Sequence, residues 1–409
     1  MTAIEDVVDY EHRSVRASVF TDRALFDLEQ NRVFGRSWLY VAHRSQLENP
    51  GDFVTANMGR DPVVVCRGKD QQLRVFLNSC PHKGARYCRE DRGNTKSFVC
   101  PYHVRTFDTA GTLIGIAGAK LADLDVVHAG LIEVPRVETF EGLVFASFDA
   151  NIIPLEDYLG DMKWYLEVIL AQAGTERTIF EGIHRWTFDA NWKFPAEQFT
   201  GDPSHQYGVH RSMGQLGFDV NFGDKQQDFV ARFDNGHGLL NMAPRNRILM
   251  TRFQRDLIES ARQRLTEDQA ELLRCLYIGT VFPNFSIVSY PGFLSVRVWQ
   301  PVAPDKTEIW SSGLVPSHAP DNVAVNSKRL LSRYFSPTGM LEQDDLEVWE
   351  ECHRGVAGAQ RNGKPVSYAL PKRPVEALAH LPGDLSAIPS EHANFGFFSR
   401  WHELMRSEA

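Results

Sequence analysis

At 409 residues the chain is long enough for two domains, because a single core rarely grows past about 250–300 residues. Apolar residues make up 43% and charged residues 23%, as in ordinary globular proteins, and the net charge of −8 gives no sign of a nucleic-acid partner. No apolar run approaches the roughly 18–20 residues that span a membrane, and the acidic N-terminus lacks a secretion signal. We therefore expect a cytoplasmic protein without a membrane partner, whose six cysteines form no structural disulfides.

The first predicted elements are a helix and a series of strands. An apolar stripe predicts a helix over residues 21–34, with Thr21 as its cap and Gly35 at its end. From about residue 38 to residue 148, short β-like runs alternate with turn residues, and one hairpin is expected to turn at residues 68–70. This part of the chain therefore reads as a small β domain.

Helices return beyond residue 154 and then alternate with strands. The predicted helices cover residues 155–173, a segment around 191–213, and 255–276, the last containing a capping box at Thr266 and Gln269. Strands are predicted at residues 280–290, 293–302 and 308–314. The fold class is therefore α+β. Its predicted parts are an N-terminal segment (1–37) that packs on the larger domain, a small β domain (38–153) and a larger α+β domain (154–409).

Four possible metal ligands lie inside the β-rich region, on two predicted loops. They are Cys80 and His82 in the first loop, and Cys100 and His103 in the second, with 17 residues between the two pairs. A structural zinc site is one interpretation, but zinc fingers usually take both cysteines from one loop. A cysteine and a histidine from each loop suit a two-iron cluster in which one iron binds both thiolates and the other both imidazoles. The cluster is the favoured interpretation, and zinc is the alternative.

The stretches "CPHKGARYC" and "CPYHVRTFD" resemble the Rieske 2Fe–2S motif of ring-hydroxylating oxygenases. The resemblance implies a cluster bound by the four residues above. One departure is that the family usually has Gly-Trp after the second histidine, where this chain has Val104 and Arg105. Cys88 lies near the first loop without a matching cysteine near the second, so we expect it to be a small buried apolar residue.

A second constellation follows in "NWKFPAEQFTGDPSHQYGVHRS", which contains Asp202, His205 and His210. Two imidazoles and a carboxylate on one face of iron leave the opposite face open for oxygen and substrate. The spacing resembles the mononuclear-iron motif of the same oxygenases. That resemblance implies that His205 and His210 bind the iron. It also implies that Asp202 carries electrons from His103 of the neighbouring subunit to His205.

The spacing of the two histidines makes a structural demand. Residues five apart lie about 140° apart around a regular helix, so we expect a distorted turn or a helix end between His205 and His210. Pro203 departs from the family pattern and allows Asp202 to act as a helix cap, a role that does not exclude the bridge.

The third iron ligand is expected to be a distant carboxylate. The stretch "GMLEQDDLEVWEE" resembles the acidic ligand segment of the family, and its second aspartate, Asp345, corresponds to the ligand. Asp344 is the main competitor, and acidic clusters of this kind are usually solvated surface.

Together the motifs resemble the large (α) subunit of a Rieske non-haem iron aromatic-ring-hydroxylating oxygenase. The resemblance implies a Rieske domain with an antiparallel β fold and a catalytic domain with an antiparallel sheet flanked by helices. It implies electrons from NADH through a reductase and a ferredoxin, and cis-dihydroxylation of an aromatic substrate by O2. An apolar pocket is expected, with these candidates: Gln198, Phe199, Phe282, Asn284, Phe335 and Leu341.

Three other functions stay open at this point. A Rieske monooxygenase of the same architecture is the nearest, and an electron carrier or a structural zinc protein would need only the first motif. No arginine is plainly placed to clamp a substrate carboxylate, and this favours an aromatic hydrocarbon or a weakly polar aromatic as the substrate. Arg297 and Arg211 are the two arginines that could overturn that expectation. The expected assembly is a ring of α subunits, either with a small β subunit (α3β3) or as an α3 homotrimer.

Overall fold

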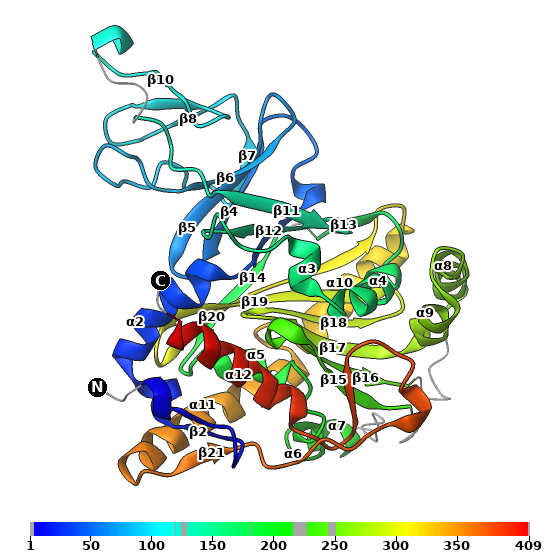
Figure 1. The fold of residues 1–409 in the computed structure, drawn as a ribbon. Coiled ribbons are helices and arrows are strands. Elements are labelled where there is room, and N and C mark those ends of the chain that lie inside the picture. Colours follow the sequence, from blue (N-terminus) through cyan, green and yellow to red (C-terminus); the bar gives the residue numbers. More distant parts are fainter. Residues whose placement is uncertain are drawn as a thin grey trace. The chain divides into compact units, whose positions relative to one another are not determined.

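The computed structural model describes residues 4–118, 120–123, 129–180, 182–215, 227–243 and 251–407. The chain forms two compact units: residues 34–155 make up the smaller one, and residues 1–33 with residues 156–409 make up the larger one (Figure 1). Among the helices in these described ranges, none has both the length and the apolar character that crossing a membrane requires.

The described residues of the smaller unit form three antiparallel sheets. Their strand orders are β6-β5-β4-β7, β10-β9-β8 and β11-β12-β3. The expected hairpin is present, because β5 and β6 pair across the turn that contains residues 68–70. The strand bounds are β3 (Leu39–His43), β4 (Asp52–Met58), β5 (Asp61–Arg67), β6 (Leu73–Leu77), β7 (Arg92–Asn94), β8 (Ser97–Val99), β9 (Thr106–Asp108), β10 (Leu113–Gly115), β11 (Arg136–Phe140) and β12 (Leu143–Ser147).

In the core of the smaller unit, cysteine side chains pack among aromatic rings. Cys80 and Cys100 lie in the same buried cluster as Phe98 and Phe107. Cys88 belongs to this cluster too and is 7% exposed, which confirms that it is a small buried residue. The two loops that carry the possible ligands therefore start from the interior, between β6 and β7 and between β8 and β9.

The larger unit is built on a nine-stranded antiparallel sheet. Its order is β13-β20-β19-β18-β17-β16-β15-β22, and β14 also pairs with β20. A separate small sheet joins β1, β2 and β21. The strand bounds are β1 (Val8–Asp9), β2 (Ser14–Arg16), β13 (Arg177–Ile179), β14 (His184–Phe188), β15 (Phe229–Arg232), β16 (Gly238–Met242), β17 (Leu276–Val281), β18 (Phe285–Tyr290), β19 (Phe293–Ala303), β20 (Lys306–Pro316), β21 (Pro365–Ser367) and β22 (Asp384–Ala387).

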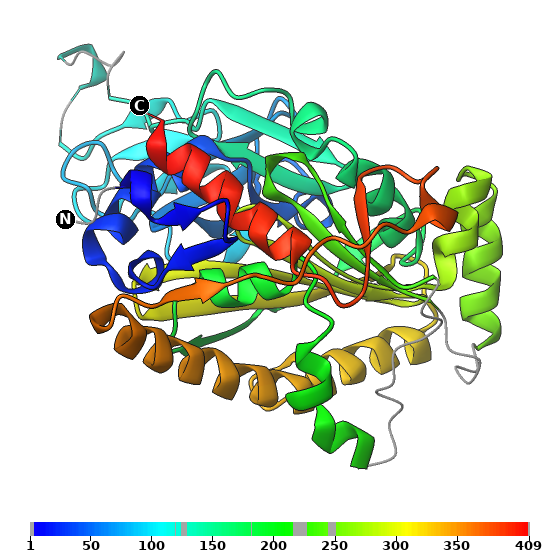
Figure 2. The ribbon, with the colours of Figure 1, turned by 60° about the horizontal axis from the view of Figure 1, so that its bottom comes forward.

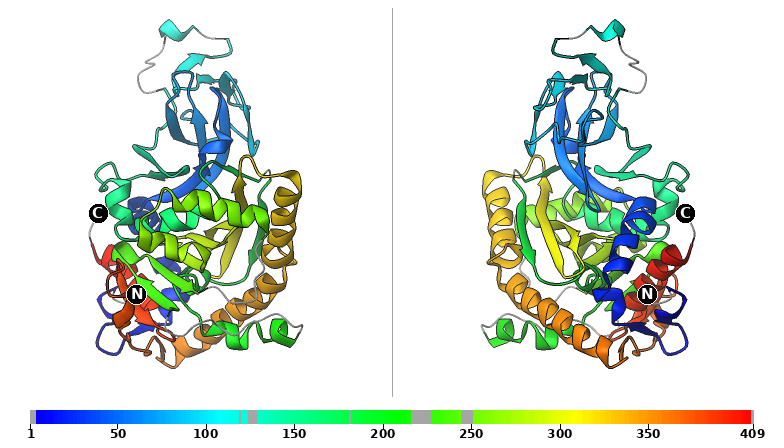
Figure 3. Two further views of the ribbon diagram at one scale, coloured as in Figure 1. Left: turned by 90° about the vertical axis from the view of Figure 1, so that its right-hand side faces the viewer. Right: turned by 90° about the vertical axis from the view of Figure 1, so that its left-hand side faces the viewer.

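Helices cover both faces of this sheet, which is why its central strands are buried on both sides. Gly279 approaches Met162 of α4, whereas the neighbouring Thr280 donates its hydroxyl hydrogen to the Ala196 carbonyl of α5 at 2.8 Å. Because successive residues of a strand point to opposite faces, α4 and α5 lie on opposite sides of the sheet. Figure 3 shows α10 and α11, yellow to orange, running along one flank of this unit.

The helix bounds are as follows, with α3 at the junction of the two units: α1 (Ser18–Thr21), α2 (Arg23–Arg32), α3 (Leu155–Leu159), α4 (Met162–Ala171), α5 (Lys193–Gln198), α6 (His205–Gly208), α7 (Arg211–Gln215), α8 (Arg252–Arg262), α9 (Glu267–Glu271), α10 (Asp321–Phe335), α11 (Met340–Arg361) and α12 (His392–Arg406).

The first predicted helix is wrong at both ends. Helix α2 begins at Arg23 and is capped by Asp22, whose side chain accepts from the amides of Ala24 and Leu25. An aspartate caps a helix at least as well as a threonine, so Asp22 caps α2 in place of the predicted Thr21. Residues 34–36 form a separate 3₁₀ turn.

Three longer predictions merged elements that the structure separates. The helix predicted over 155–173 is broken at Gly160, where φ is +50°, into α3 and α4. The strand predicted over 280–290 is the β17–β18 hairpin, because Pro283 cannot continue a central strand. The helix predicted over 255–276 is α8, α9 and a 3₁₀ turn, and the predicted capping box at Thr266 is confirmed.

A buried carboxylate ties the N-terminal segment to the rest of the larger unit. Glu29 of α2 is fully buried and pairs with the buried ammonium of Lys193 at the start of α5. It also accepts from the indole nitrogens of Trp192 at 2.9 Å and Trp401 of α12 at 2.8 Å. Figure 2 shows α12, in red, beside the blue N-terminal elements. Three elements far apart in sequence are thereby held at one carboxylate.

Replacing Glu29 with glutamine is expected to lower the free energy of unfolding by about 3–5 kcal/mol, because it leaves the Lys193 ammonium buried without its counter-charge. Chemical denaturation of the purified variant measures the change. The matched control is Glu11→Gln, which neutralises an exposed carboxylate of the same segment and should have little effect. Equal stabilities of Glu29→Gln and the parent would contradict a stabilising role for this ion pair.

Candidate metal centres

The two loops of the smaller unit have the same backbone structure. In residues 80–85 the Cys80 amide donates to the Ala85 carbonyl at 2.9 Å, and the Gly84 amide donates to the Cys80 carbonyl at 2.8 Å. Residues 100–105 repeat both bonds, at 2.8 and 3.0 Å. Each loop therefore folds back on its own cysteine and presents a histidine within the turn.

The side chains of the two loops come together as an inner pair of thiols and an outer pair of imidazoles. The thiols of Cys80 and Cys100 are buried and interact with each other, and burial raises the pKa of Cys80. The rings of His82 and His103 lie with centroids 4.6 Å apart at 70°. Loss of hydration and then the charge of Arg105 lower the pKa of His82, which favours the neutral form that binds metal. This donor set fits a cluster with one thiolate-bound and one imidazole-bound iron.

The second loop carries conformational strain that the first avoids. The fifth residue of each loop has a positive φ, +74° at Gly84 and +54° at Val104. Glycine adopts this conformation freely, whereas a β-branched side chain is disfavoured there. The departure from Gly-Trp noted in the sequence therefore falls at a position whose backbone favours glycine.

Replacing Val104 with glycine is expected to stabilise the smaller unit by about 1 kcal/mol, because it removes this strain from an exposed site. Thermal unfolding of the cluster-loaded protein, followed by its visible absorbance, measures the change. Val99→Gly is the matched control: Val99 is an exposed valine in strand β8, so its replacement should destabilise instead. If both variants lose stability alike, Val104 is not strained.

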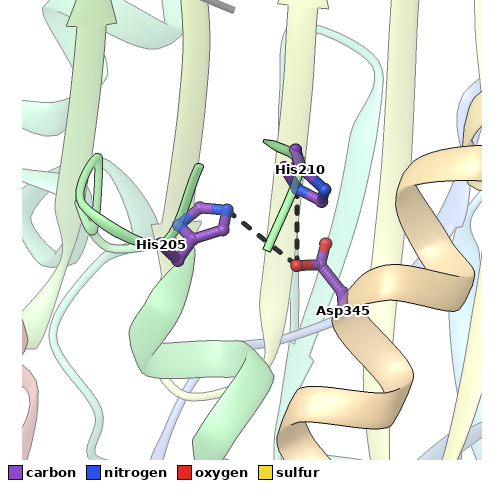
Figure 4. A group of neighbouring side chains, drawn as sticks. All are labelled: His205, His210 and Asp345. Atoms are coloured by element: carbon purple, nitrogen blue, oxygen red, sulfur yellow. Dashed lines mark ion pairs between the residues drawn. The ribbon is translucent and has the colours of Figure 1, made fainter. Parts of the chain in front are cut away.

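The second group of possible ligands lies in the larger unit and comes from two separate segments (Figure 4). His205 begins α6, His210 lies between α6 and α7, and Asp345 lies on α11. The Asp345 Oδ1 atom is 3.9 Å from His205 Nε2 and 3.5 Å from His210 Nε2. One donor atom of each residue lies within 4.8 Å of the others. The structure thus brings together the three residues that sequence reasoning chose as iron ligands.

The expected break between the two histidines is present. Helix α6 ends at Gly208, the Val209 amide donates to the His205 carbonyl at 2.7 Å, and α7 starts only at Arg211. This interruption allows both imidazoles to face the same carboxylate, with ring centroids 5.2 Å apart.

Asp202 contacts His205 in two ways. Its Oδ1 accepts from the amides of Ser204 at 2.8 Å and His205 at 3.3 Å, as expected for an aspartate before a short helix. The His205 Nδ1 lies 2.5 Å from the Asp202 backbone carbonyl and 3.8 Å from Oδ2. The Asp202 side chain is 35% exposed, and the two amides bind its Oδ1 atom rather than Oδ2.

Two successive hydrogen bonds, which the sequence analysis did not predict, hold Asp345 in place. The Gln198 amide nitrogen donates to Asp345 Oδ1 at 3.1 Å, and the Trp349 indole donates to Gln198 Oε1 at 2.8 Å. Gln198, expected as a pocket residue, therefore orients a candidate ligand. Trp349 lies four residues after Asp345 on the same face of α11, and that spacing was the available signal.

Asp344 has a distinct position beside the other histidine. Its Oδ2 lies 3.4 Å from His210 Nδ1 and 3.3 Å from the Ser212 hydroxyl. Burial lowers the pKa of His210, and Asp345 and Asp344 act in the opposite direction. A neutral imidazole with one nitrogen near Asp345 and the other near Asp344 suits metal binding. The acidic pair is thus divided between two positions around the site.

The guanidinium of Arg297 binds groups inside the protein. It forms a fully buried ion pair with Glu342 of α11 and donates to the Phe335 carbonyl at 3.1 Å. Burial raises the pKa of Glu342 to about 7, although Arg297 opposes the shift. The pair links β19 to the end of α10 and the start of α11, just before Asp345.

The remaining pocket candidates fall into two groups. Phe199 and Phe335 flank the Arg297 guanidinium, and Leu341 lies one turn before Asp345 on α11. The Phe282 ring packs against Phe397 of α12 at an angle of 60°, and Asn284, just before β18, donates to the Trp299 carbonyl of β19. The contacts of these last two are those of core residues.

These two donor sets define a class: a protein with an imidazole–thiolate 2Fe–2S cluster and a separate non-haem iron held by two histidines and a carboxylate. Comparison with known protein families agrees. The family described as the catalytic domain of the ring-hydroxylating α subunit matches residues 155–406, and the Rieske 2Fe–2S domain matches residues 37–126.

Individual relatives extend over almost the whole chain. Benzene 1,2-dioxygenase subunit alpha of Pseudomonas putida is 35% identical over 99% of this chain and 94% of its own, and biphenyl 2,3-dioxygenase subunit alpha of Rhodococcus jostii is 34% identical over 99% and 91%. The solved structure of naphthalene 1,2-dioxygenase from a Rhodococcus species bound to indole has a TM-score of 0.90 and 32% identity, covering 99% of this chain and 97% of that one.

The chain therefore belongs to the α subunits of Rieske aromatic-ring-hydroxylating oxygenases. It is an oxidoreductase of the dioxygenase type with a Rieske cluster and a mononuclear iron. A quaternary ammonium Rieske monooxygenase bound to L-carnitine shares the fold at a TM-score of 0.73 but only 20% identity.

Proposed function

We propose that this chain cis-dihydroxylates an aromatic hydrocarbon or a weakly polar aromatic, using O2 and electrons that originate from NADH. The observation that carries the proposal is the convergence of His205, His210 and Asp345 in a chain that also holds the Rieske donor set. Relatives above 30% identity over nearly the full chain are named dioxygenases, which favours this outcome over monooxygenation.

Each candidate ligand has a separate supporting group. His205 and His210 would bind iron as neutral imidazoles, and Asp345 would supply the carboxylate. Gln198 holds one Asp345 oxygen, which limits how the carboxylate can turn. When bound, the ferrous ion supplies open positions for oxygen activation, and the cluster supplies single electrons.

The substrate proposal rests on what surrounds the site. Phe199 and Phe335 are aromatic, Leu341 is aliphatic, and Arg297 is already neutralised by Glu342. A guanidinium with a buried carboxylate partner is a poor clamp for a substrate carboxylate, because the substrate would have to displace that partner. An uncharged aromatic ring is therefore the substrate we expect.

The electron path that we propose runs between subunits. Oδ1 of Asp202 is used by local amides, whereas the side chain stays partly exposed and can accept from the His103 imidazole of a neighbouring copy. This requires head-to-tail contacts that close a ring. We propose an α3β3 assembly first and an α3 homotrimer second, fed by a reductase and a ferredoxin. The native mass of the complex distinguishes the two assemblies.

Product analysis under labelled oxygen tests the reaction. The purified oxygenase, supplied with a reductase, a ferredoxin and NADH, is incubated with naphthalene or biphenyl under ¹⁸O2. A cis-dihydrodiol that carries two labelled atoms supports the proposal. Incorporation of a single labelled atom would favour the alternative, a Rieske monooxygenase that hydroxylates or dealkylates.

Metal analysis separates this proposal from the simpler ones. A cluster and a mononuclear iron require three irons and two labile sulfides per chain. A colourless protein with stoichiometric zinc would favour a structural zinc protein, and a cluster without the third iron would favour an electron carrier.

A further inference from the structure

The two ligand loops differ chemically at their sixth residue, although their backbones match. The Cys80 amide donates to the carbonyl of Ala85, and the Cys100 amide donates to the carbonyl of Arg105, so these two residues occupy equivalent places. An uncharged methyl group thus stands beside one loop and a guanidinium beside the other.

The charge of Arg105 reaches the ligands of the opposite loop. The Arg105 carbonyl accepts from the amide of Cys100, and His103 lies two residues before Arg105, so the backbone holds this residue beside two of the four candidate ligands. Its charge also acts on Cys80 and His82 of the opposite loop. Within the described residues Arg105 has no carboxylate ion-pair partner, and it is only partly exposed, so its charge is neither paired nor fully screened by solvent.

The charge of the redox centre determines the direction of the effect. Two ferric ions, two sulfides, two thiolates and two neutral imidazoles sum to zero, and one added electron makes the reduced centre negative. A fixed positive charge nearby stabilises the reduced form more than the oxidised form.

We propose that Arg105 tunes the electron reservoir of this oxygenase by raising the reduction potential of the centre held by Cys80, His82, Cys100 and His103. The inference depends on the proposed ligand set. In this proposal Arg105 does not bind iron. It acts on the centre through its positive charge, which the loop backbone holds close to the ligands.

The test is a redox titration of the purified, cluster-loaded protein at one pH, followed by the EPR signal of the reduced cluster. Arg105→Gln is expected to shift the reduction equilibrium about fivefold toward the oxidised form, which is about 40 mV lower at 59 mV per tenfold. Arg105→Lys keeps the charge and should stay near the parent. Arg44→Gln, which neutralises an exposed arginine on the 3₁₀ turn after β3, controls for net charge.

An unchanged midpoint in Arg105→Gln would overturn the inference, as would an equal drop in Arg105→Lys or in Arg44→Gln. If Arg105→Gln does not retain its cluster, Arg105→Met provides the same comparison. Failure of the proposed ligand set looks different, because the parent protein itself would then lack the Rieske-type EPR signal.

Discussion

Replacing Asp345 with alanine is expected to abolish the mononuclear iron site, so that the iron content falls from three to two per chain while the Rieske spectrum persists. Turnover should fall at least about 1000-fold, because no other described carboxylate lies within the same 4.8 Å group. Metal analysis with EPR of the reduced protein measures the loss of iron, and product formation measures turnover.

The neighbouring aspartate provides the matched control. Asp344 contacts His210 Nδ1 at 3.4 Å and lies outside that group, so Asp344→Asn should retain iron and weaken its binding by about 10-fold. If Asp345→Ala keeps its third iron and Asp344→Asn loses it, the roles assigned to the two aspartates are reversed.

Replacing Asp202 with alanine is expected to leave all three irons in place and to reduce turnover by about 100-fold or more. The reason is that the proposed path from the neighbouring subunit's cluster loses its carboxylate, whereas the candidate iron ligands are untouched. Single-turnover experiments measure the effect: electrons stored in a chemically reduced cluster should fail to reach the mononuclear site.

Asp202 also supports the local backbone, so a second variant separates the two roles. Asp202→Asn keeps an oxygen that can accept from the amides of Ser204 and His205, but it removes the negative charge. A bridging role predicts that Asp202→Asn is impaired nearly as much as Asp202→Ala. Normal turnover in Asp202→Asn would leave only the capping role.

Most of the candidate ligands could be predicted from local sequence motifs. The cluster candidates Cys80, His82, Cys100 and His103 come from two short loops, and His205 and His210 are only five residues apart. Ligands of one metal that are close in sequence leave a recognisable spacing, so they can be found without a structure. The interrupted helix between His205 and His210 followed from the same spacing, because a regular turn cannot aim both rings at one point.

Prediction of the secondary structure failed where a single residue ended an element. Gly160, with its positive φ, divides one predicted helix, and Pro283 divides one predicted strand. In both cases the apolar pattern continues across the break, so periodicity alone joins what the backbone separates. Asp22 took the place of Thr21 as a cap for a similarly local reason.

The sequence by itself determined the two loop motifs, the histidine pair and the division into a β-rich part and an α+β part. Each of these features depends on residues that are close together along the chain. Only the tertiary structure decided that Gln198 and Trp349 hold Asp345, with Gln198 and Asp345 separated by 147 residues, and that Arg297 is neutralised by Glu342. Such contacts depend on how the sheet and helices pack, and packing leaves no periodic trace in the chain. Because these groups orient the candidate ligands and limit the substrate's charge, the fold decided the fine chemistry of a site whose ligands the motifs had already indicated.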